Sequence, residues 1–254
     1  MNIAVCADRF VGYELLKFIF EEDKSPIKLV LTQKDSPYRS KIEKLCSDYG
    51  IEYHSNIDCN SNSFRSLLRQ KDIDIGLLLW WPKILKKETI RSVKKGFINT
   101  HPSLLPLNRG KHPYYWAVIN ENPLGSTLHF INENIDEGLI LFQEAYDIDI
   151  SQTGDIIYEN SLDHMIYLFK KNYKNILTSS YVPKKQNLKE GDFHLSRDIE
   201  KHSRIDLEQT YLAKDLLNRI RARTFKNNKS SFFFHNGKRY FVRLEIEEDK
   251  GQYD

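Results

Sequence analysis

The chain has 254 residues, enough for one α/β domain with a small appendage and a substantial buried core. Its 38 basic and 35 acidic residues give a net charge of +3, and this near balance argues against a protein whose main partner is nucleic acid. Charged residues make up 29% of the chain and apolar runs are short, which excludes a membrane span. The first residues read as a strand without the longer apolar core of a signal peptide, so we expect a cytoplasmic protein.

The cysteines and the other potential metal ligands are scattered. Cys6, Cys46 and Cys59 are odd in number and no two have CxxC spacing, so neither a disulfide framework nor a structural zinc site is indicated. Since no His, Cys or Asp cluster has ligand spacing either, we expect an activity that needs no metal.

The first part of the chain alternates between strand and helix patterns. Strands are expected at 2–7, 27–32, 51–54 and 73–81, and helices around 15–20, 40–49 and 63–70. The run 73–81 is almost wholly apolar, as in a strand buried on both faces. We therefore predict an α/β fold with a Rossmann-like, mostly parallel sheet covered by helices on both faces. No G-x-G-x-x-G follows the first strand, which disfavours a dinucleotide cofactor.

The second part of the chain predicts a boundary near residue 182. Strands are expected at 126–131 and 144–149, and an amphipathic helix at 153–177. A polar linker (183–204) then separates the main domain (1–182) from an appendage (205–254) with a helix at 206–224 and a hairpin around Asn236-Gly237. One helix and two strands bury little surface alone, so we expect this appendage to pack on the main domain or on a second subunit.

The stretch Asn99-Thr100-His101-Pro102 ends another short apolar strand. Residues two apart on a strand face the same side, so the Asn99 amide and the His101 imidazole can converge on one small group. Pro102 ends the strand and holds His101 at its carboxyl end, where open α/β sheets bind ligands.

Further motifs follow this stretch in a fixed order. They are Arg109-Gly110, Pro113-Tyr114-Tyr115-Trp116-Ala117, Gly125-Ser126-Thr127-Leu128-His129-Phe130 and Ile135-Asp136-Glu137-Gly138-Leu139-Ile140. In this order the chain resembles the folate-dependent formyltransferase family, which includes the glycinamide ribonucleotide, methionyl-tRNA and nucleotide-sugar N-formyltransferases. The resemblance covers about residues 1–180 and is densest between Trp80 and Ile140.

The resemblance implies N10-formyltetrahydrofolate as co-substrate and Asn99, His101 and Asp136 as catalytic residues. Formyl transfer creates an oxyanion and moves protons between two nitrogens. Asn99 can donate to the oxyanion, and His101 can donate to it and move protons. Asp136 is implied to hold His101 or to relay protons through it. We expect His129, on the strand at 126–131, to be a hydrogen-bonded structural histidine.

The resemblance also implies the two binding regions. The folate pocket is expected to involve Trp81, Lys83, Ile84, Leu85, Asn132, Ile135 and Asp136, although Trp80 and Trp81 also fit a core role with a helix starting at Pro82. For the acceptor substrate we name Arg9, Lys111 and His112, for which exposed loop charges are the alternative. The arginines Arg219, Arg221 and Arg223 are expected at a solvated helix end.

The loop at 33–40 and the size of the C-terminal tail help to predict which amine is formylated. Compared with the tRNA-acting members that it resembles, the chain has a short loop at 33–40 with mixed charge and a small tail. We therefore expect a nucleotide-linked amino deoxysugar, first dTDP-4-amino-4,6-dideoxyglucose, for surface polysaccharide such as lipopolysaccharide O-antigen. Methionyl-tRNA and glycinamide ribonucleotide formylation are the alternatives. We further expect a homodimer, without nucleic-acid or membrane partners.

Overall fold

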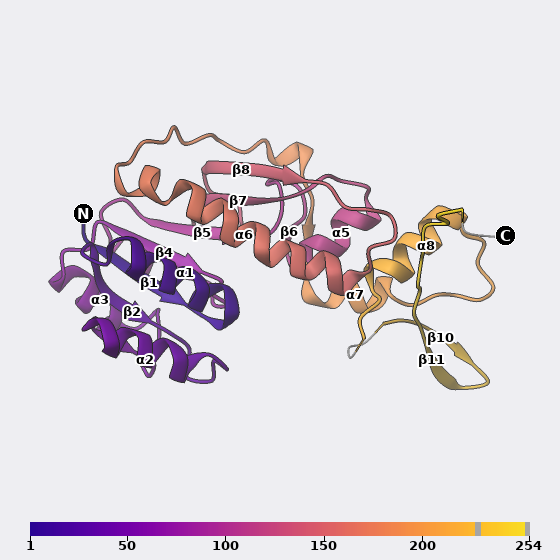
Figure 1. Cartoon of the computed structure of the whole chain (residues 1–254), viewed down its shortest axis with the longest axis horizontal. Helices are drawn as coiled ribbons and strands as arrows, with labels where there is room; N and C mark the ends of the chain where they lie inside the picture. Colours follow the sequence, from indigo (N-terminus) through magenta and orange to yellow (C-terminus); the bar gives the residue numbers. More distant parts are fainter. Residues whose placement is uncertain (227–229, 252–254) are drawn as a thin grey trace.

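The computed structural model describes residues 1–226 and 230–251, in which the chain folds around one seven-stranded sheet (Figure 1). Its strands are β1 (Ile3–Ala7), β2 (Ile27–Leu31), β3 (Tyr53–His54), β4 (Ile75–Leu79), β5 (Phe97–His101), β7 (Leu124–Phe130) and β8 (Ile140–Tyr146). The order is β3-β2-β1-β4-β5-β7-β8; the first five strands are parallel, and β7 and β8 run antiparallel to their neighbours. The predicted mostly parallel sheet is confirmed.

Helices cover both faces of this sheet, as predicted. The helices are α1 (Arg9–Asp23), α2 (Arg39–Tyr49), α3 (Asn62–Gln70), α4 (Lys87–Ile90), α5 (Pro113–Ile119), α6 (Gly154–Leu177), α7 (Ser196–His202) and α8 (Ala213–Ala222). Apolar side chains of α1, α2 and α6 form one buried cluster with the sheet, and those of α3 form another with the opposite face. Both faces of β1 and β4 are buried, which explains their continuous apolar sequences.

One predicted strand of the main domain is wrong, and the alternative of a helix after Trp81 is excluded. The strand expected at 144–149 lies earlier, as β8, because Ile140 and Leu141 pack in the core while the chain leaves the sheet after Tyr146. No helix starts at Pro82. The backbone of Trp80 has a positive φ of 57°. The Asn60 side chain donates to the Ile84 carbonyl and accepts from the Lys86 amide, which holds residues 84–86 in a non-helical conformation.

The segment 183–204 is more than the polar linker that its composition predicts. It contains a 3-10 turn (Leu188–Glu190), the strand β9 (Phe193–His194) and α7. β9 pairs in parallel with β6 (Arg109–Gly110), and the His194 ring stacks on Trp116 with ring centroids 3.9 Å apart. These long-range contacts connect the segment to residues 109–116 of the main domain.

The appendage contains α8 and the hairpin of β10 (Ser231–His235) and β11 (Lys238–Val242). Residues 227–229 and 252–254 of the predicted subdomain lie outside the described residues. The hairpin turn has positive φ at Asn236 and Gly237, as its sequence predicts. The hairpin projects away from the sheet (Figure 1). α8 is shorter than the predicted 206–224 and packs beside α5 and α6, with Ala222 in a cluster shared with both.

Arg221 is 7% exposed and donates to Asn218 and to the Gln152 carbonyl, so the predicted solvated helix end is wrong at this residue.

Candidate active site

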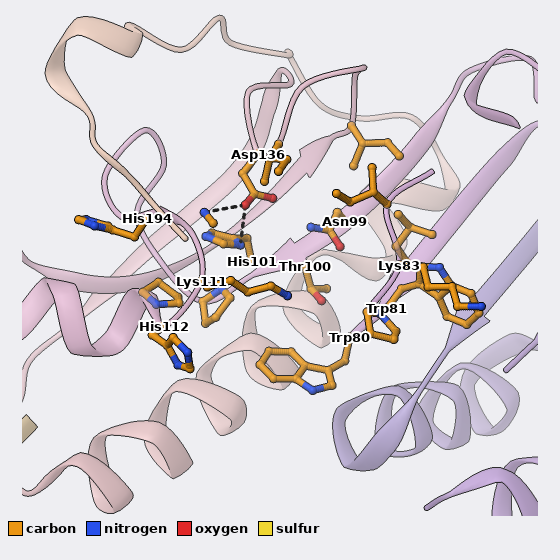
Figure 2. Close-up of a pocket in the computed structure, with 18 of the residues that line it drawn as sticks. Trp80, Trp81, Lys83, Asn99, Thr100, His101, Lys111, His112, Asp136 and His194 are labelled. Carbon is orange, nitrogen blue, oxygen red and sulfur yellow. Dashed lines mark hydrogen bonds and ion pairs between the residues drawn. The ribbon is translucent and has the colours of Figure 1, made fainter. Parts of the chain in front are cut away.

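One cavity of about 570 Å³ lies at the carboxyl ends of β1, β4 and β5, next to the point where the strand order reverses between β1 and β4 (Figure 2). Every residue expected to act in catalysis or to bind the folate or the acceptor lines it: Arg9, Trp81, Lys83, Ile84, Leu85, Asn99, His101, Lys111, His112, Asn132, Ile135 and Asp136. The structure thus brings the expected catalytic, folate and acceptor residues together, while their roles remain predictions.

Asn99, His101 and Asp136 meet in the middle of this cavity. Asn99 and His101 lie on the same side of β5 because they are two residues apart. His101 Nδ1 is 3.6 Å from Asp136 Oδ2. Its Nε2 atom is buried and has no hydrogen-bond partner among the residues that the structure describes. The ring therefore has one nitrogen beside a carboxylate and the other available to a substrate.

Asp136 is held in a tight turn between β7 and β8. Its φ is 56°, a left-handed conformation that is uncommon for a residue other than glycine. The backbone N–H of Gly110 donates to Asp136 Oδ2 over 3.0 Å, and next to it Arg109 forms an ion pair with Glu137. These contacts join the motif around Arg109 to the turn, although the two are far apart in sequence.

His129 is fully buried and faces Asn99 from the neighbouring strand β7. Burial lowers the pKa of His129 to about 4, so its ring is neutral near pH 7, with the nearby Asp136 acting in the opposite direction. Its Nδ1 lies 2.9 Å from the Phe130 carbonyl, which can only accept. Nε2 is therefore the acceptor, and it takes one hydrogen bond from the Asn99 amide over 3.2 Å. The second N–H of that amide has no partner among the described residues and can donate to a ligand.

The end of the cavity expected to take the folate is bounded by Trp80, Trp81 and the segment after them (Figure 2). Leu85 is buried, whereas the Ile84 side chain is 66% exposed. The Ile84 carbonyl already accepts a hydrogen bond from Asn60 over 2.9 Å, so a ligand there would share this carbonyl or use the other backbone groups. Ile131, Asn132, Asn134 and Ile135 also line the cavity, and Ile131 packs in the same apolar cluster as Trp81 and Leu85.

The opposite end of the cavity carries Arg9, Lys111 and His112. Arg9 and Lys111 are exposed, and neither forms an ion pair within the described part of the chain. Burial lowers the pKa of His112, and the charges of Arg223 and Lys111 lower it further, so His112 is neutral near pH 7. Two cations and one neutral imidazole therefore face this end, which suits an anionic group.

Known families match both halves of the chain. The family described as "Formyl transferase" matches residues 15–168, which is more than half of the chain. The chain belongs to this family. Residues 198–248 match a second family, described as "N-formyltransferase dimerization C-terminal domain".

Named relatives fall into two substrate classes. The dTDP-4-amino-4,6-dideoxyglucose formyltransferase of Mycobacterium tuberculosis is 30% identical over 154 residues, 60% of this chain. The match spans 65% of that relative, just under two thirds of its length. A methionyl-tRNA formyltransferase of Caldicellulosiruptor saccharolyticus is 30% identical over 233 residues, which cover 87% of this chain and 73% of the relative.

A solved structure shares the fold over almost the whole chain. It is a 4-N formyltransferase from Francisella tularensis, 26% identical, with a TM-score of 0.79 and 98% of each chain covered. The fold similarity therefore includes the C-terminal helix and hairpin.

Sequence reasoning missed part of the cavity wall. Tyr158 and Ser161 are three residues apart on α6 and both face the cavity, a spacing that helical periodicity can reveal. The wall formed by Phe193, His194, Leu195 and Ser196 carries no such signal. It reaches the cavity through the pairing of β9 with β6, which depends on contacts about 84 residues apart.

The described part of the chain has neither a metal-binding cluster nor a membrane-spanning helix. No three His, Cys, Asp or Glu side chains there are grouped to hold a metal ion. No described helix combines the length and apolar character needed to cross a membrane. The three cysteines are free and buried.

Proposed function

We propose that this protein transfers the formyl group of N10-formyltetrahydrofolate to the amine of a nucleotide-linked amino deoxysugar. The observation that carries this proposal is the meeting of Asn99, His101 and Asp136 in a cavity that extends to both sides of them. The amine nitrogen forms a bond to the formyl carbon, the bond from that carbon to N10 breaks, and N10 takes up a proton. The products are the formamido sugar and tetrahydrofolate.

The three central side chains support these steps. The free N–H of Asn99 donates to the oxyanion that develops on the formyl oxygen. His101 Nε2 is the ring nitrogen without a partner, and it carries the proton from the attacking amine to N10. Asp136, beside Nδ1, orients the ring so that Nε2 points to the reacting groups.

The folate and the sugar occupy opposite ends of the cavity in this proposal. The slot formed by Trp81, Lys83, Ile84, Leu85, Asn132 and Ile135 offers backbone groups and apolar surface to the flat pterin. Arg9 and Lys111 bind the diphosphate at the other end, and the neutral His112 serves as a hydrogen-bonding group. Tyr114 and Tyr158 lie between them and add an apolar wall for the deoxysugar.

We favour dTDP-4-amino-4,6-dideoxyglucose as the acceptor, used in building surface polysaccharide such as O-antigen. The mycobacterial relative named for this substrate and the Francisella 4-N formyltransferase support the choice. The methionyl-tRNA formyltransferase, which matches a larger share of the chain, keeps tRNA as the second candidate. A tRNA needs many phosphate contacts over a wide surface, whereas Arg9 and Lys111 at one end of the cavity suit one diphosphate.

We also propose that the protein is a homodimer in the cytoplasm. In this proposal its chain consists of a catalytic domain (1–182), a linker (183–204) and a C-terminal subdomain (205–254). The C-terminal family match supports a dimer built through the appendage. Its hairpin exposes Phe234, Tyr240 and Phe241, which a second subunit would cover. Light scattering of the full chain and of residues 1–182 tests this; a monomeric full chain contradicts it.

A panel of amines tests the activity. The protein is incubated with N10-formyltetrahydrofolate and, separately, dTDP-4-amino-4,6-dideoxyglucose, its 3-amino isomer, UDP-4-amino-arabinose, glycinamide ribonucleotide and methionyl-tRNA, and tetrahydrofolate release is followed. We expect turnover with the first sugar, rising with pH above neutrality as the amine loses its proton, and weakly dependent on salt. Turnover on methionyl-tRNA alone, with steep salt dependence, would establish the second candidate instead.

A further inference from the structure

A residue of the segment 183–204, which follows α6, forms hydrogen bonds with the turn that carries Asp136. Gln186 is 7% exposed and is the one buried residue between Val182 and Glu190. Its Nε2 atom donates to the carbonyl of Asp136 over 2.8 Å and to the carbonyl of Gly138 over 2.7 Å. A single side chain therefore bridges the two ends of the turn.

The chemistry of this contact fixes how the Gln186 amide is oriented. Both partners are carbonyls and can only accept, so the NH₂ group must face them, and a reversed amide would bring three oxygens together. The Oε1 atom is buried and has no partner among the described residues. The amide is thus held by its two donated hydrogen bonds, with its acceptor left unsatisfied.

The Asp136 turn needs support of this kind. A φ of 56° is strained for aspartate and persists only where surrounding contacts hold it. The Asp136 carboxylate lies 3.6 Å from His101 Nδ1 and 3.7 Å from His129 Nε2, so a small relaxation of the turn would carry it away from both rings. We propose that Gln186 is a positioning residue that keeps the Asp136 carboxylate beside His101. This inference rests on the proposed formyl transfer and assigns a role in it to the segment 183–204.

The test replaces Gln186 with methionine, which has similar length and leaves no buried polar group of its own. We expect Gln186→Met to lower kcat by about 10- to 100-fold, because the reacting groups lose their alignment. KM for both substrates should change by less than about twofold, since neither binds Gln186. The matched control is Asn187→Ala, which should behave as wild type. Asn187 is an exposed neighbour, and within the described part of the chain its side chain bonds only to Glu190.

A double-mutant cycle separates positioning from a general structural role. If Gln186 acts through the Asp136 carboxylate, Gln186→Met should lower kcat by less than about threefold when Asp136→Asn is already present. The same drop in both backgrounds, or an unchanged kcat in the single variant, would overturn the proposal.

Hydrogen exchange gives a readout that needs no substrate. The Gly110 amide donates to Asp136 Oδ2, so it should exchange faster in Gln186→Met than in wild type or Asn187→Ala. Unchanged protection of Gly110 in Gln186→Met would contradict the inference. If the proposed acceptor amine is wrong, the wild-type protein will formylate a different amine of the panel. The double-mutant cycle is then measured with that amine, so an error in the acceptor does not count against the role of Gln186.

Discussion

Gly138 packs directly against the backbone of Phe130. A Cβ atom on Gly138 would lie 1.6 Å from the Phe130 carbonyl oxygen, so the position accepts no side chain unless one of the two segments moves. Phe130 follows His129 at the end of β7, and Gly138 follows Asp136 by two residues. The contact therefore sets the distance between the strand that carries His129 and the turn that carries Asp136.

Gly138→Ala should displace the Asp136 turn. We expect it to destabilise the fold by about 3 kcal/mol or more, because the obstacle is backbone and not a flexible side chain, and to lower kcat. Gly237→Ala is the control: a Cβ there meets nothing within 4 Å, and its positive φ alone costs about 1 to 2 kcal/mol. Thermal unfolding and turnover measure both effects. Wild-type turnover in Gly138→Ala would show that the turn tolerates the shift.

His129→Leu should impair the alignment of Asn99. The variant removes the acceptor for one Asn99 N–H, so the amide can rotate away from the oxyanion position. We expect kcat to fall by about tenfold or more with little change in KM, measured below the unfolding temperature of the variant. If kcat stays at the wild-type value while Asn99→Ala is impaired, Asn99 is held by something other than His129.

Asn99→Ala and His101→Asn should each lower kcat by about 10²-fold or more and leave KM nearly unchanged, since both act mainly on developing charge. Combining them should cost much less than the product of the single effects, because they serve one transition state. Steady-state kinetics of the three variants measures this. Near-wild-type turnover in either single variant would remove that residue from the mechanism.

The meeting of Asn99 and His101 was predictable because it depends on local rules. Alternation along a strand puts the two side chains on one face, and Pro102 places that face at the carboxyl end of β5. The hairpin turn at Asn236-Gly237 is predictable for the same reason, since its positive φ values follow from the residue types.

The role of the segment 183–204 was not predictable in this way. Its polar composition indicates a solvated linker, and the burial of Gln186 depends on a turn about 50 residues earlier in the chain. The absence of a helix at Pro82 likewise follows from a distant partner, Asn60, whose side chain binds the segment. Contacts between parts far apart in sequence leave no periodic signal.

Arg9→Ala and Lys111→Ala should weaken binding of the acceptor specifically. Each removes one exposed cation from the end of the cavity proposed to hold the diphosphate. We expect KM for the sugar nucleotide to rise about tenfold, with KM for the folate and kcat nearly unchanged. Lys189→Ala, an exposed cation of the segment 183–204 away from the cavity, is the matched control. Equal effects of all three variants would indicate only a general effect of charge.

His202 should make the protein less stable in mild acid. Its Nδ1 lies 2.7 Å from the Tyr115 hydroxyl, and burial, followed by the charges of Arg219 and His194, lowers its pKa to about 4. The Arg219 guanidinium can only donate to Nε2, over 3.5 Å, so the neutral ring carries its proton on Nδ1 and donates it to the Tyr115 oxygen. Burial raises the pKa of Tyr115 to about 12, so the hydroxyl itself stays protonated.

The direction of the pH effect follows from these values. The unfolded chain protonates this histidine near its ordinary pKa of 6.5, before the folded chain does near 4, so the free energy of unfolding falls as pH drops through this window. His202→Asn keeps an amide that can hydrogen-bond near the position of Nδ1 but does not titrate. Between about pH 7.5 and pH 5, wild type should lose about 1 to 2 kcal/mol more stability than the variant, measured by denaturant unfolding. His129 titrates identically in both proteins and cancels in this difference, so parallel pH profiles would show that His202 is not the group responsible.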